Sequence, residues 1–208
     1  MIRMALPKGR NLTSAKAAFR AAGLSLAVLE RDERKLLLAS PEDDLELLLL
    51  KGWDVPRYVQ YGIADCGIVG TDVLDELDGD LLVPVRFAQG RCRLSFIGEE
   101  GAWPAPGRQV RLATKYPGIA RQVLQEQPWG AEILELSGSI ELAPLLDLAD
   151  LALDIVQTGR TLQENHLQEL KVVREVAPCL VVNRASFQEH RRPINDLIGR
   201  LEAAGVVE

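Results

Sequence analysis

One stretch decides the fold: Leu151-Ala152-Leu153-Asp154-Ile155-Val156-Gln157-Thr158-Gly159-Arg160-Thr161-Leu162. Its first six residues form an apolar run that is typical of a buried strand, and a Thr-Gly turn then leads into a helix. Gly159 carries no Cβ, so a ligand can approach the backbone closely. Free N–H groups at the start of a helix favour a phosphate monoester, and Thr158 and Thr161 add hydroxyl groups. The stretch therefore predicts an anion-binding turn at the end of a buried strand.

A plainer interpretation is that Thr158 or Thr161 only caps a helix. Residues 161–164, Thr-Leu-Gln-Glu, fit the capping-box pattern. Asp154 favours a ligand site, because a carboxylate inside an apolar run is costly unless a partner satisfies it. Beside a phosphate-binding turn, the two hydroxyls of a ribose would be natural partners.

The rest of the chain alternates short apolar runs with amphipathic segments, which indicates an α/β architecture. Strands are predicted at residues 2–6, 36–39, 45–50, 63–69, 81–88, 92–97, 110–114, 132–136, 151–156, 171–176 and 180–183. Helices are predicted at 11–22 with Asn11 as the cap, 54–61 with Asp54 as the cap, from Thr71, and at 117–127, 158–165 and 192–204.

An internal echo links two parts of the chain. Residues 64–71 (ADCGIVGT) resemble residues 149–159 (ADLALDIVQTG), since both run from an acidic start through an apolar strand into a Gly/Thr turn. The echo suggests two similar lobes that face each other across a cleft. The match is short, and chance similarity remains an equal alternative.

Cationic side chains follow several predicted strands. Lys8-Gly9-Arg10 comes directly after the first one, and Lys51 and Lys115 stand at two further strand ends. Loops at the carboxyl ends of strands face the ligand crevice in open α/β sheets, and such cations suit a polyphosphate. The alternative is a solvated surface, where Lys and Arg are common. Glu141 lies in the turn 137–141, where an acid could also complement a helix dipole.

Composition narrows the function class. The 208 residues carry a formal net charge of −6, which argues against nucleic-acid binding. The longest apolar run is far shorter than a membrane span, and no signal peptide is visible, so we expect a cytoplasmic protein without membrane contact. Cys66, Cys92 and Cys179 show no CxxC pairing, which predicts buried thiols rather than a metal site or disulfides.

Seven motifs together resemble the short form of the ATP phosphoribosyltransferase family. They are Leu6-Pro7-Lys8-Gly9-Arg10, DVPRYV at 54–59, GIADCGIVG at 62–70, ATKYP at 113–117, GSIELAP at 138–144, the segment 154–165, and VNRAS at 182–186. They span nearly the whole chain in order. Two positions depart from the family pattern: Lys51 stands where several relatives carry Arg, and His166 replaces a common Gly.

The resemblance implies a two-lobed α/β fold like that of type II periplasmic binding proteins, with a central cleft. Lobe I would comprise residues 1–88 and 176–208, and lobe II residues 89–175. The implied reaction condenses ATP with phosphoribosyl pyrophosphate, giving phosphoribosyl-ATP and pyrophosphate in the first step of histidine biosynthesis. Magnesium (Mg2+) would assist.

Carried over by matching position, the resemblance gives roles to individual residues. Lys8, Arg34 and Lys51 would be catalytic, with Arg34 presented across a dimer interface. The other implied substrate-binding residues are Gly9, Arg10, Asp65, Gly70, Lys115, Glu141, Asp154, Thr158, Gly159, Arg160, Thr161 and Leu162. Among these, residues 158–162 would hold the 5′-phosphate, and Asp154 and Glu141 would lie near the ribose.

The resemblance also implies partners. A homodimer would join a regulatory subunit resembling histidyl-tRNA synthetase in a hetero-octamer, because a chain ending at Glu208 would lack the regulatory domain of long-form relatives. The alternatives are a non-catalytic small-anion binding protein of the same two-lobed fold and a phosphoribosyltransferase acting on a free base. The first has no need of lysines around a phosphate turn, and most enzymes of the second kind carry paired acids before the Thr-Gly turn.

Overall fold

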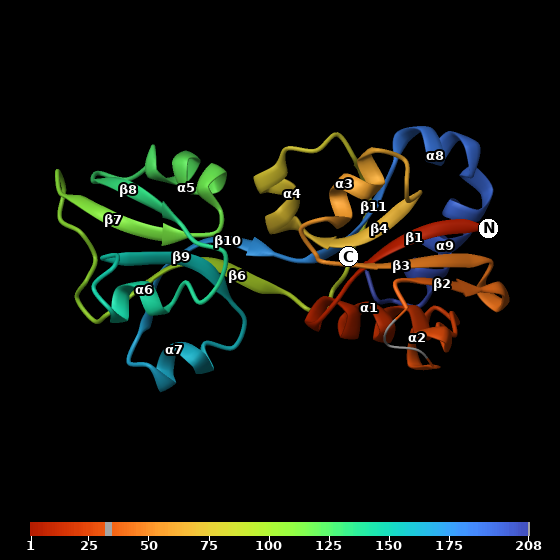
Figure 1. The fold of residues 1–208 in the computed structure, drawn as a ribbon, viewed down its shortest axis with the longest axis horizontal. Coiled ribbons are helices and arrows are strands. Elements are labelled where there is room, and N and C mark those ends of the chain that lie inside the picture. The colour runs from red at the N-terminus through yellow and green to blue at the C-terminus, as the bar shows by residue number, and fades with distance from the viewer. Residues whose placement is uncertain (32–34, 208) are drawn as a thin grey trace. The chain divides into compact units, whose positions relative to one another are not determined.

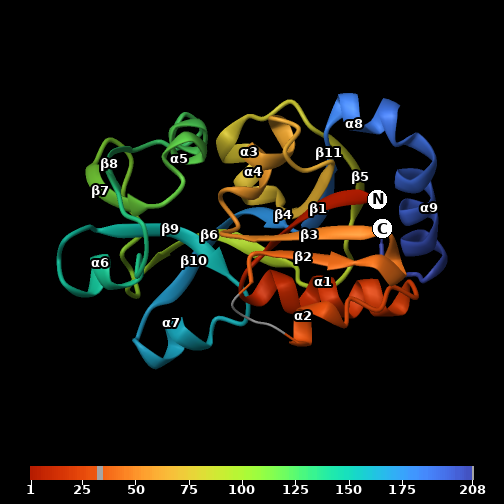
Figure 2. The ribbon, with the colours of Figure 1, turned by 45° about the vertical axis from the view of Figure 1, so that its right-hand side comes forward.

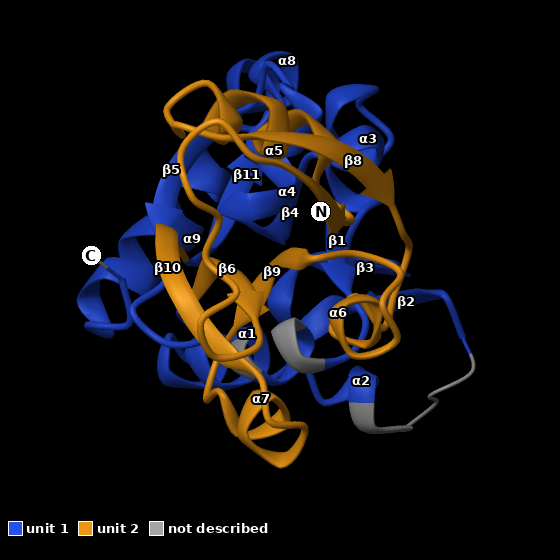
Figure 3. Ribbon diagram, turned by 90° about the vertical axis from the view of Figure 1, so that its left-hand side faces the viewer, with its two compact units in different colours: residues 1–91, 177–208 blue, residues 92–176 orange. Residues whose placement is uncertain are grey.

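The computed structural model describes residues 1–31 and 35–207. The chain divides into two compact units, which are distinguished by colour in Figure 3. Unit 1 comprises residues 1–91 and 177–208, and unit 2 comprises residues 92–176. The chain therefore leaves unit 1 after residue 91 and returns to it at residue 177, so that unit 1 is discontinuous in sequence (Figure 1).

Unit 1 is built on a six-stranded sheet of order β2-β3-β1-β4-β11-β5. Its strands are β1 (Ile2–Pro7), β2 (Leu37–Ser40), β3 (Leu45–Leu50), β4 (Cys66–Gly70), β5 (Leu82–Arg86) and β11 (Pro178–Val182). β1 pairs in parallel with both β3 and β4, so these three strands end at the same edge of the sheet. β2 and β11 are antiparallel to their neighbours.

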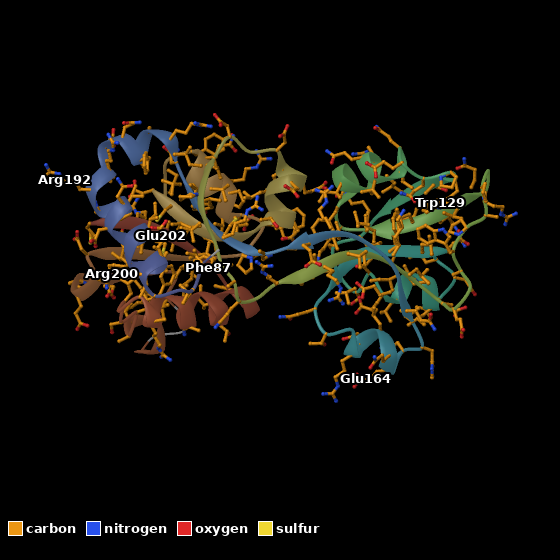
Figure 4. All side chains as sticks on the ribbon, turned by 180° about the vertical axis from the view of Figure 1, so that it is seen from behind. Phe87, Trp129, Glu164, Arg192, Arg200 and Glu202 are labelled. Atoms are coloured by element: carbon orange, nitrogen blue, oxygen red, sulfur yellow. The ribbon has the colours of Figure 1, made fainter. Side chains whose placement is uncertain are left out.

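Helices cover both faces of this sheet (Figure 2). They are α1 (Arg10–Ala21), α2 (Val28–Arg31), α3 (Val55–Gln60), α4 (Thr71–Leu77), α8 (Arg184–Glu189) and α9 (Arg191–Ala203), with a 3-10 turn η1 (Pro41–Asp43). Because side chains alternate along β1, Met4 packs with α1 and α9, whereas Ala5 packs with α3 and α4. Arg200 of α9 donates hydrogen bonds to the carbonyl oxygens of Ala22 and Gly23 at 3.0 and 2.7 Å and so ties the two helices together (Figure 4).

Unit 2 holds a five-stranded sheet of order β10-β6-β9-β7-β8. Its elements are β6 (Cys92–Gly98), β7 (Gln109–Thr114), α5 (Pro117–Leu124), β8 (Gly130–Glu135), α6 (Leu142–Leu145), β9 (Leu151–Val156), α7 (Arg160–Glu164) and β10 (Gln168–Val176). β7 is parallel to β8 and β9, while β6 runs antiparallel to β9 and to β10. On one face, Phe96, Trp103 and Trp129 form edge-to-face pairs 5.5 to 5.6 Å apart; Trp129 is labelled in Figure 4.

The internal echo corresponds to matching hydrogen bonds in the two units. In unit 1 the Arg3 N–H donates to Asp65 Oδ2 at 2.8 Å, and the Asp65 N–H donates to the Arg3 carbonyl at 2.8 Å. In unit 2 the Arg111 N–H donates to Asp150 Oδ2 at 2.6 Å, and the Asp150 N–H donates to the Arg111 carbonyl at 2.9 Å. We call each arrangement an aspartate clamp. Each clamp fastens the start of one parallel strand to its neighbour, so the echo reflects a repeated structural unit.

Several predicted element boundaries were wrong, and three short helices were not predicted. α1 begins at Arg10 with Gly9 as its cap, so Asn11 lies inside the helix. The predicted strand 63–69 begins only at Cys66, because the clamp at Asp65 precedes it. The short helices α2, α6 and α8 were not predicted, and α8 is capped by Asn183, whose Oδ1 accepts the N–H groups of Ala185 and Ser186.

The prediction of buried thiols holds for two of the three cysteines. Cys66 and Cys179 are buried, and Cys92 is half-buried. Burial raises the pKa of the Cys66 thiol, and it raises the pKa of Cys179 to about 12. Among residues 1–31 and 35–207, no helix is long and apolar enough to cross a membrane.

The clamp in unit 1 can be tested by substitution. Asp65→Ala leaves the Arg3 N–H without its carboxylate acceptor and should lower the unfolding free energy by about 1–3 kcal/mol, the range for a hydrogen bond to a charged group. Asp65→Asn keeps a neutral acceptor and should cost less than half as much. Urea unfolding followed by circular dichroism measures both. An Asp65→Ala variant as stable as the original protein would show that the clamp does not hold β4.

Candidate active site

Three parallel strands of unit 2 bring separate parts of the sequence to one sheet edge. β9, β7 and β8 are neighbours and end at the same side. The loop after β9 carries Thr158 and Gly159, Lys115 follows β7, and the segment after β8 leads to Glu141. The carboxyl ends of parallel strands are where open α/β sheets bind ligands. These candidate residues of unit 2 therefore converge, although up to 47 positions separate them in the printed sequence, Lys115 to Leu162.

The turn after β9 has the backbone shape that its sequence predicts. Gly159 has φ 74°, in the left-handed region, and is the cap residue of α7. A side chain is strained in that conformation, which explains the need for glycine. Thr158 Oγ1 lies 3.4 Å from the Arg160 N–H. The predicted capping box was wrong: Thr161 lies within α7, and the cap residue is Gly159.

The residues of α7 have different surroundings. Leu162 is 7% exposed and packs into the core, so its side chain anchors the helix and only its backbone can face a ligand. Arg160 is exposed, and its guanidinium forms an ion pair at 2.8 Å with Glu164, one turn along the helix. Just past α7, His166 has φ 56°. That conformation favours glycine, which gives a physical reason for the glycine expected at this position.

Asp154 is the half-buried acid of this edge. Its Oδ1 lies 3.0 Å from Lys115 Nζ, and the two side chains are 16% and 27% exposed. The contact is an ion pair, and among the residues that the structure describes this buried Oδ1 accepts no hydrogen bond of regular geometry. Lys115 also lies 5.1 Å from the ring centre of Tyr116. A carboxylate thus stands beside the turn, neutralised by a lysine and able to accept further hydrogen bonds.

Glu141 occupies the third loop of this edge. It is the cap residue of α6, yet its side chain makes no capping hydrogen bond. The turn before it includes Ser139 at φ 49°. An acid at the start of α6 is also in the position to complement the helix dipole, so both interpretations of Glu141 remain open.

Unit 1 gathers its candidates in the same way. β1, β3 and β4 end side by side, which places Lys8 beside Lys51: Pro7 pairs with Leu50, and the Lys8 N–H donates to the Leu50 carbonyl at 2.8 Å. Gly9, at φ 82°, opens α1 at this edge, so Arg10 is the first residue of that helix.

Gly70 ends β4 at the same edge of unit 1. A Cβ at this position would collide with the carboxylate of Asp72. A larger residue there would force the Asp72 side chain, in the first turn of α4, to move.

One predicted site residue lies elsewhere in unit 1, and another falls outside the described residues. Asp65 is not at this edge: it precedes β4, at the end of the strand opposite Gly70, and its carboxylate is occupied by the Arg3 N–H and approached by His190 Nε2 at 3.9 Å. Its motif signalled the clamp rather than a ligand contact. Arg34, predicted to be catalytic, lies outside the described residues.

One group beside the turn was missed by sequence reasoning. Arg93 of β6 forms a bidentate pair with Glu169 of β10, with both N–O distances 2.8 Å, and Ser95 Oγ donates to Glu169 at 2.6 Å. Residues 74 and 76 positions apart carry no local signal of such pairing. Only strand order brings them together.

A hollow of about 370 Å³ also lies in unit 2, at the other edge of the sheet. Its walls include Trp103, Arg108, Val110, Asp147 and Asp150, which stand at or before the beginnings of β7 and β9. None of the predicted substrate-binding residues lines it. Within the part of the chain that the structure describes, no three His, Cys, Asp or Glu side chains gather as a metal cluster.

Comparison with known proteins identifies the family. The profile described as "HisG: ATP phosphoribosyltransferase" matches residues 51–203. ATP phosphoribosyltransferases from Geobacillus kaustophilus and Acidithiobacillus ferrooxidans are 43% and 42% identical to this chain, with 98% and 97% of the chain and 98% and 96% of those proteins covered. These relatives match the chain over nearly its full length.

Solved structures support the same assignment. The ATP phosphoribosyl transferase (HisG:HisZ) complex from Thermotoga maritima matches with a TM-score of 0.83 at 31% identity, covering 98% of both chains. Tv2483 bound to L-arginine matches with a TM-score of 0.60 at 9% identity, covering 98% of this chain and 82% of that one, which shows the fold alone. The predicted α/β, two-lobed fold of the type II periplasmic-binding-protein kind is confirmed. With the profile covering most of its length and close relatives aligned from end to end, the chain belongs to the ATP phosphoribosyltransferase family.

Proposed function

We propose that the carboxyl edge of unit 2 holds the phosphoribosyl group, with the 5′-phosphate on residues 158–162. The reaction follows from the family: ATP and phosphoribosyl pyrophosphate give phosphoribosyl-ATP and pyrophosphate, the first step of histidine biosynthesis. The observation that carries the placement is the left-handed Gly159 directly after a buried strand. It turns the backbone so that the first N–H groups of α7, which have no partner within the helix, can point at a phosphate.

The ribose would lie over the two carboxylates of this edge. Within residues 1–31 and 35–207, a buried oxygen of Asp154 accepts no hydrogen bond of regular geometry, and the Glu141 side chain makes no capping hydrogen bond. A pair of ribose hydroxyls can donate to such acceptors. Lys115 keeps the Asp154 carboxylate neutralised before the substrate arrives, which offsets the cost of burying the charge.

In this proposal, cationic side chains stabilise the transition state. As the bond from the anomeric carbon to pyrophosphate breaks, positive charge grows on the ribose and negative charge on the leaving group. The backbone of β1 and β3 sets Lys8 beside Lys51, and these cations would stabilise the leaving group or the phosphates of ATP. Gly9 and Arg10 would extend that site, and Arg34 would act from a second copy of the chain.

A ring nitrogen of the adenine of ATP attacks the anomeric carbon, so no side chain needs to form a covalent intermediate. Holding two large anions in line supplies much of the acceleration. In this scheme the described residues bind, orient and neutralise charge.

Magnesium fits this donor set. Mg2+ is usually held by one or two carboxylates together with substrate phosphates, and Glu141 and Asp154 supply oxygen donors at the edge of unit 2. The ion would neutralise charge on the pyrophosphate of the substrate. The protein residues would then position the ribose and the 5′-phosphate.

We also propose a homodimer that joins a regulatory subunit resembling histidyl-tRNA synthetase in a hetero-octamer in the cytoplasm. The similarity to a HisG chain solved in a HisG:HisZ complex supports this proposal. Light scattering of the purified chain should give about twice its mass of 22.9 kDa. A monomer at working concentration would contradict the dimer, and failure of a matching regulatory chain to shift the mass further would contradict the octamer.

The reaction itself has a direct assay. Purified protein mixed with ATP, phosphoribosyl pyrophosphate and Mg2+ should form product that absorbs in the ultraviolet. Addition of the regulatory chain shows whether activity depends on it. Binding of the substrates without any product, with and without that chain, would favour the alternative of a non-catalytic small-anion binding protein.

Lys8→Ala should lower kcat/KM by about a hundredfold, because it removes a fixed charge that stabilises the leaving group. Arg192→Ala is the matched control: Arg192 is an exposed cation of α9, labelled in Figure 4, and its loss should change kcat/KM less than twofold, within the small effect usual for such surface positions. Steady-state kinetics with both substrates measures the two variants. Equal kinetics for Lys8→Ala and Arg192→Ala would remove Lys8 from the mechanism.

Gly159→Ala should raise KM for phosphoribosyl pyrophosphate by about tenfold, since an L residue at φ 74° costs about 1–2 kcal/mol and the turn relaxes away from its binding shape. Its added Cβ would have room, because the nearest atom is 3.9 Å away, so the effect is conformational rather than steric. Gly199→Ala in α9 is the control and should leave KM unchanged and stability equal or higher. Unchanged KM in Gly159→Ala would place the 5′-phosphate elsewhere.

A further inference from the structure

The sheet of unit 2 carries a row of charged side chains near the turn at residues 158–162. In the β6–β9 ladder, Ser95 pairs with Asp154, and Arg93 pairs with Val156, the last residue before the turn. Cross-strand partners point to the same face of a sheet. Glu169 reaches the same face from β10, because it accepts a hydrogen bond from Ser95 Oγ. Two carboxylates, Asp154 and Glu169, therefore flank the buried Ser95.

Each carboxylate of this row is paired with one cation. Lys115 Nζ lies 3.0 Å from Asp154 Oδ1, and the Arg93 guanidinium donates two hydrogen bonds of 2.8 Å to Glu169. Lys115 follows β7, on the far side of β9, whereas Arg93 stands on β6, two residues from Ser95, and reaches across to Glu169 on β10. The formal charge of the row is zero.

Glu169 poses a physical problem for an anion site. β10 is two strands from β9, about 10 Å across the sheet, and the register places Glu169 opposite Ile97 and so level with Ala152, which puts its carboxylate on the order of 15 Å from the turn. If the Glu169 charge were uncompensated, it would repel a bound phosphate. At the effective dielectric constant of a protein surface, this repulsion would lower the affinity for the phosphate by about tenfold. The carboxylate is only 22% exposed, so water screens it incompletely.

We propose that Arg93 is a positioning residue for phosphoribosyl pyrophosphate binding, acting through charge compensation: it neutralises Glu169 so that the turn at residues 158–162 can hold the 5′-phosphate. Arg93 itself leans toward β10, away from β9, and so does not contact the substrate. The inference rests on the placement of the 5′-phosphate proposed above. It predicts that loss of Arg93 raises KM for phosphoribosyl pyrophosphate because the Glu169 charge is then uncompensated. Removing the Glu169 charge as well should restore KM.

A double-mutant cycle tests this. Arg93→Met should raise KM for phosphoribosyl pyrophosphate by about tenfold with kcat within twofold, because only a distant charge changes. Glu169→Gln alone should change KM by less than about threefold, and the Arg93→Met/Glu169→Gln double variant should return KM to within about threefold of the original value. Arg93→Lys keeps the charge and should behave like the original protein, which separates charge from bidentate geometry. Circular dichroism and thermal midpoints verify that each variant is folded.

Other results would overturn the inference. If the double variant is as impaired as Arg93→Met, Arg93 contacts the phosphate or acts only as a structural brace. Arg184→Met, which breaks the exposed Arg184–Asp80 pair of unit 1 at 2.8 Å, is the control and should leave KM unchanged. Gly159→Ala is measured in parallel. If KM rises in Gly159→Ala but not in Arg93→Met, the charge compensation by Arg93 is refuted, while the placement of the phosphate stands. Unchanged KM in both refutes the placement of the phosphate and the compensation together.

The pair also has a pH signature. The hydrogen bonds from Arg93 hold the pKa of Glu169 below its ordinary value of 4.5, and Ser95 lowers it further, against the opposing effect of burial. A carboxyl group whose pKa is lower in the folded state stabilises the fold above its unfolded pKa, and that contribution is lost as pH falls through the folded value. From about pH 7 to about pH 3, the original protein should therefore lose more unfolding free energy than Glu169→Gln. Equal losses would show that the pair is not formed in solution.

Discussion

The aspartate clamp is the constraint on which both units depend. In each, a carboxylate just before a buried strand accepts the N–H of the neighbouring strand, while its own N–H donates to that strand's carbonyl. This pair of bonds sets which residues stand side by side, because a slip of one residue would turn every side chain to the other face. The clamps lie at the amino ends of the strands. They thereby fix which residues emerge at the carboxyl ends, where the candidate site residues lie.

Charge balance is the second theme of unit 2. An anion site beside buried carboxylates would repel its own ligand unless those carboxylates were neutralised. Lys115 neutralises Asp154, and Arg93 neutralises Glu169. The protein as a whole carries a net charge of −6, yet local pairing leaves the turn without an uncompensated acid from this row. Overall charge therefore says little about where a phosphate can bind.

Sequence reasoning succeeded where the signal was local. The strands at 2–6 and 151–156 were predicted from their apolar pattern, and a loop was expected after each, where the structure has Gly9 and Gly159. It failed where a motif had two physical meanings. Asp65 shares its motif with a strand that ends at the site, but its side chain belongs to the other end of that strand. Thr161 fits a capping pattern, but the chain turns at Gly159, so the helix begins before it.

The sequence by itself determined the α/β class, the glycine-dependent turns and the family, because these depend on periodicity, backbone freedom and motifs that lie within a few residues of one another. Only the tertiary structure decided that Lys115 neutralises Asp154, that Lys8 stands beside Lys51, and that Arg93 pairs with Glu169. Those pairings depend on strand order and register. Hydrogen bonds between residues tens of positions apart set both, and no local pattern encodes them.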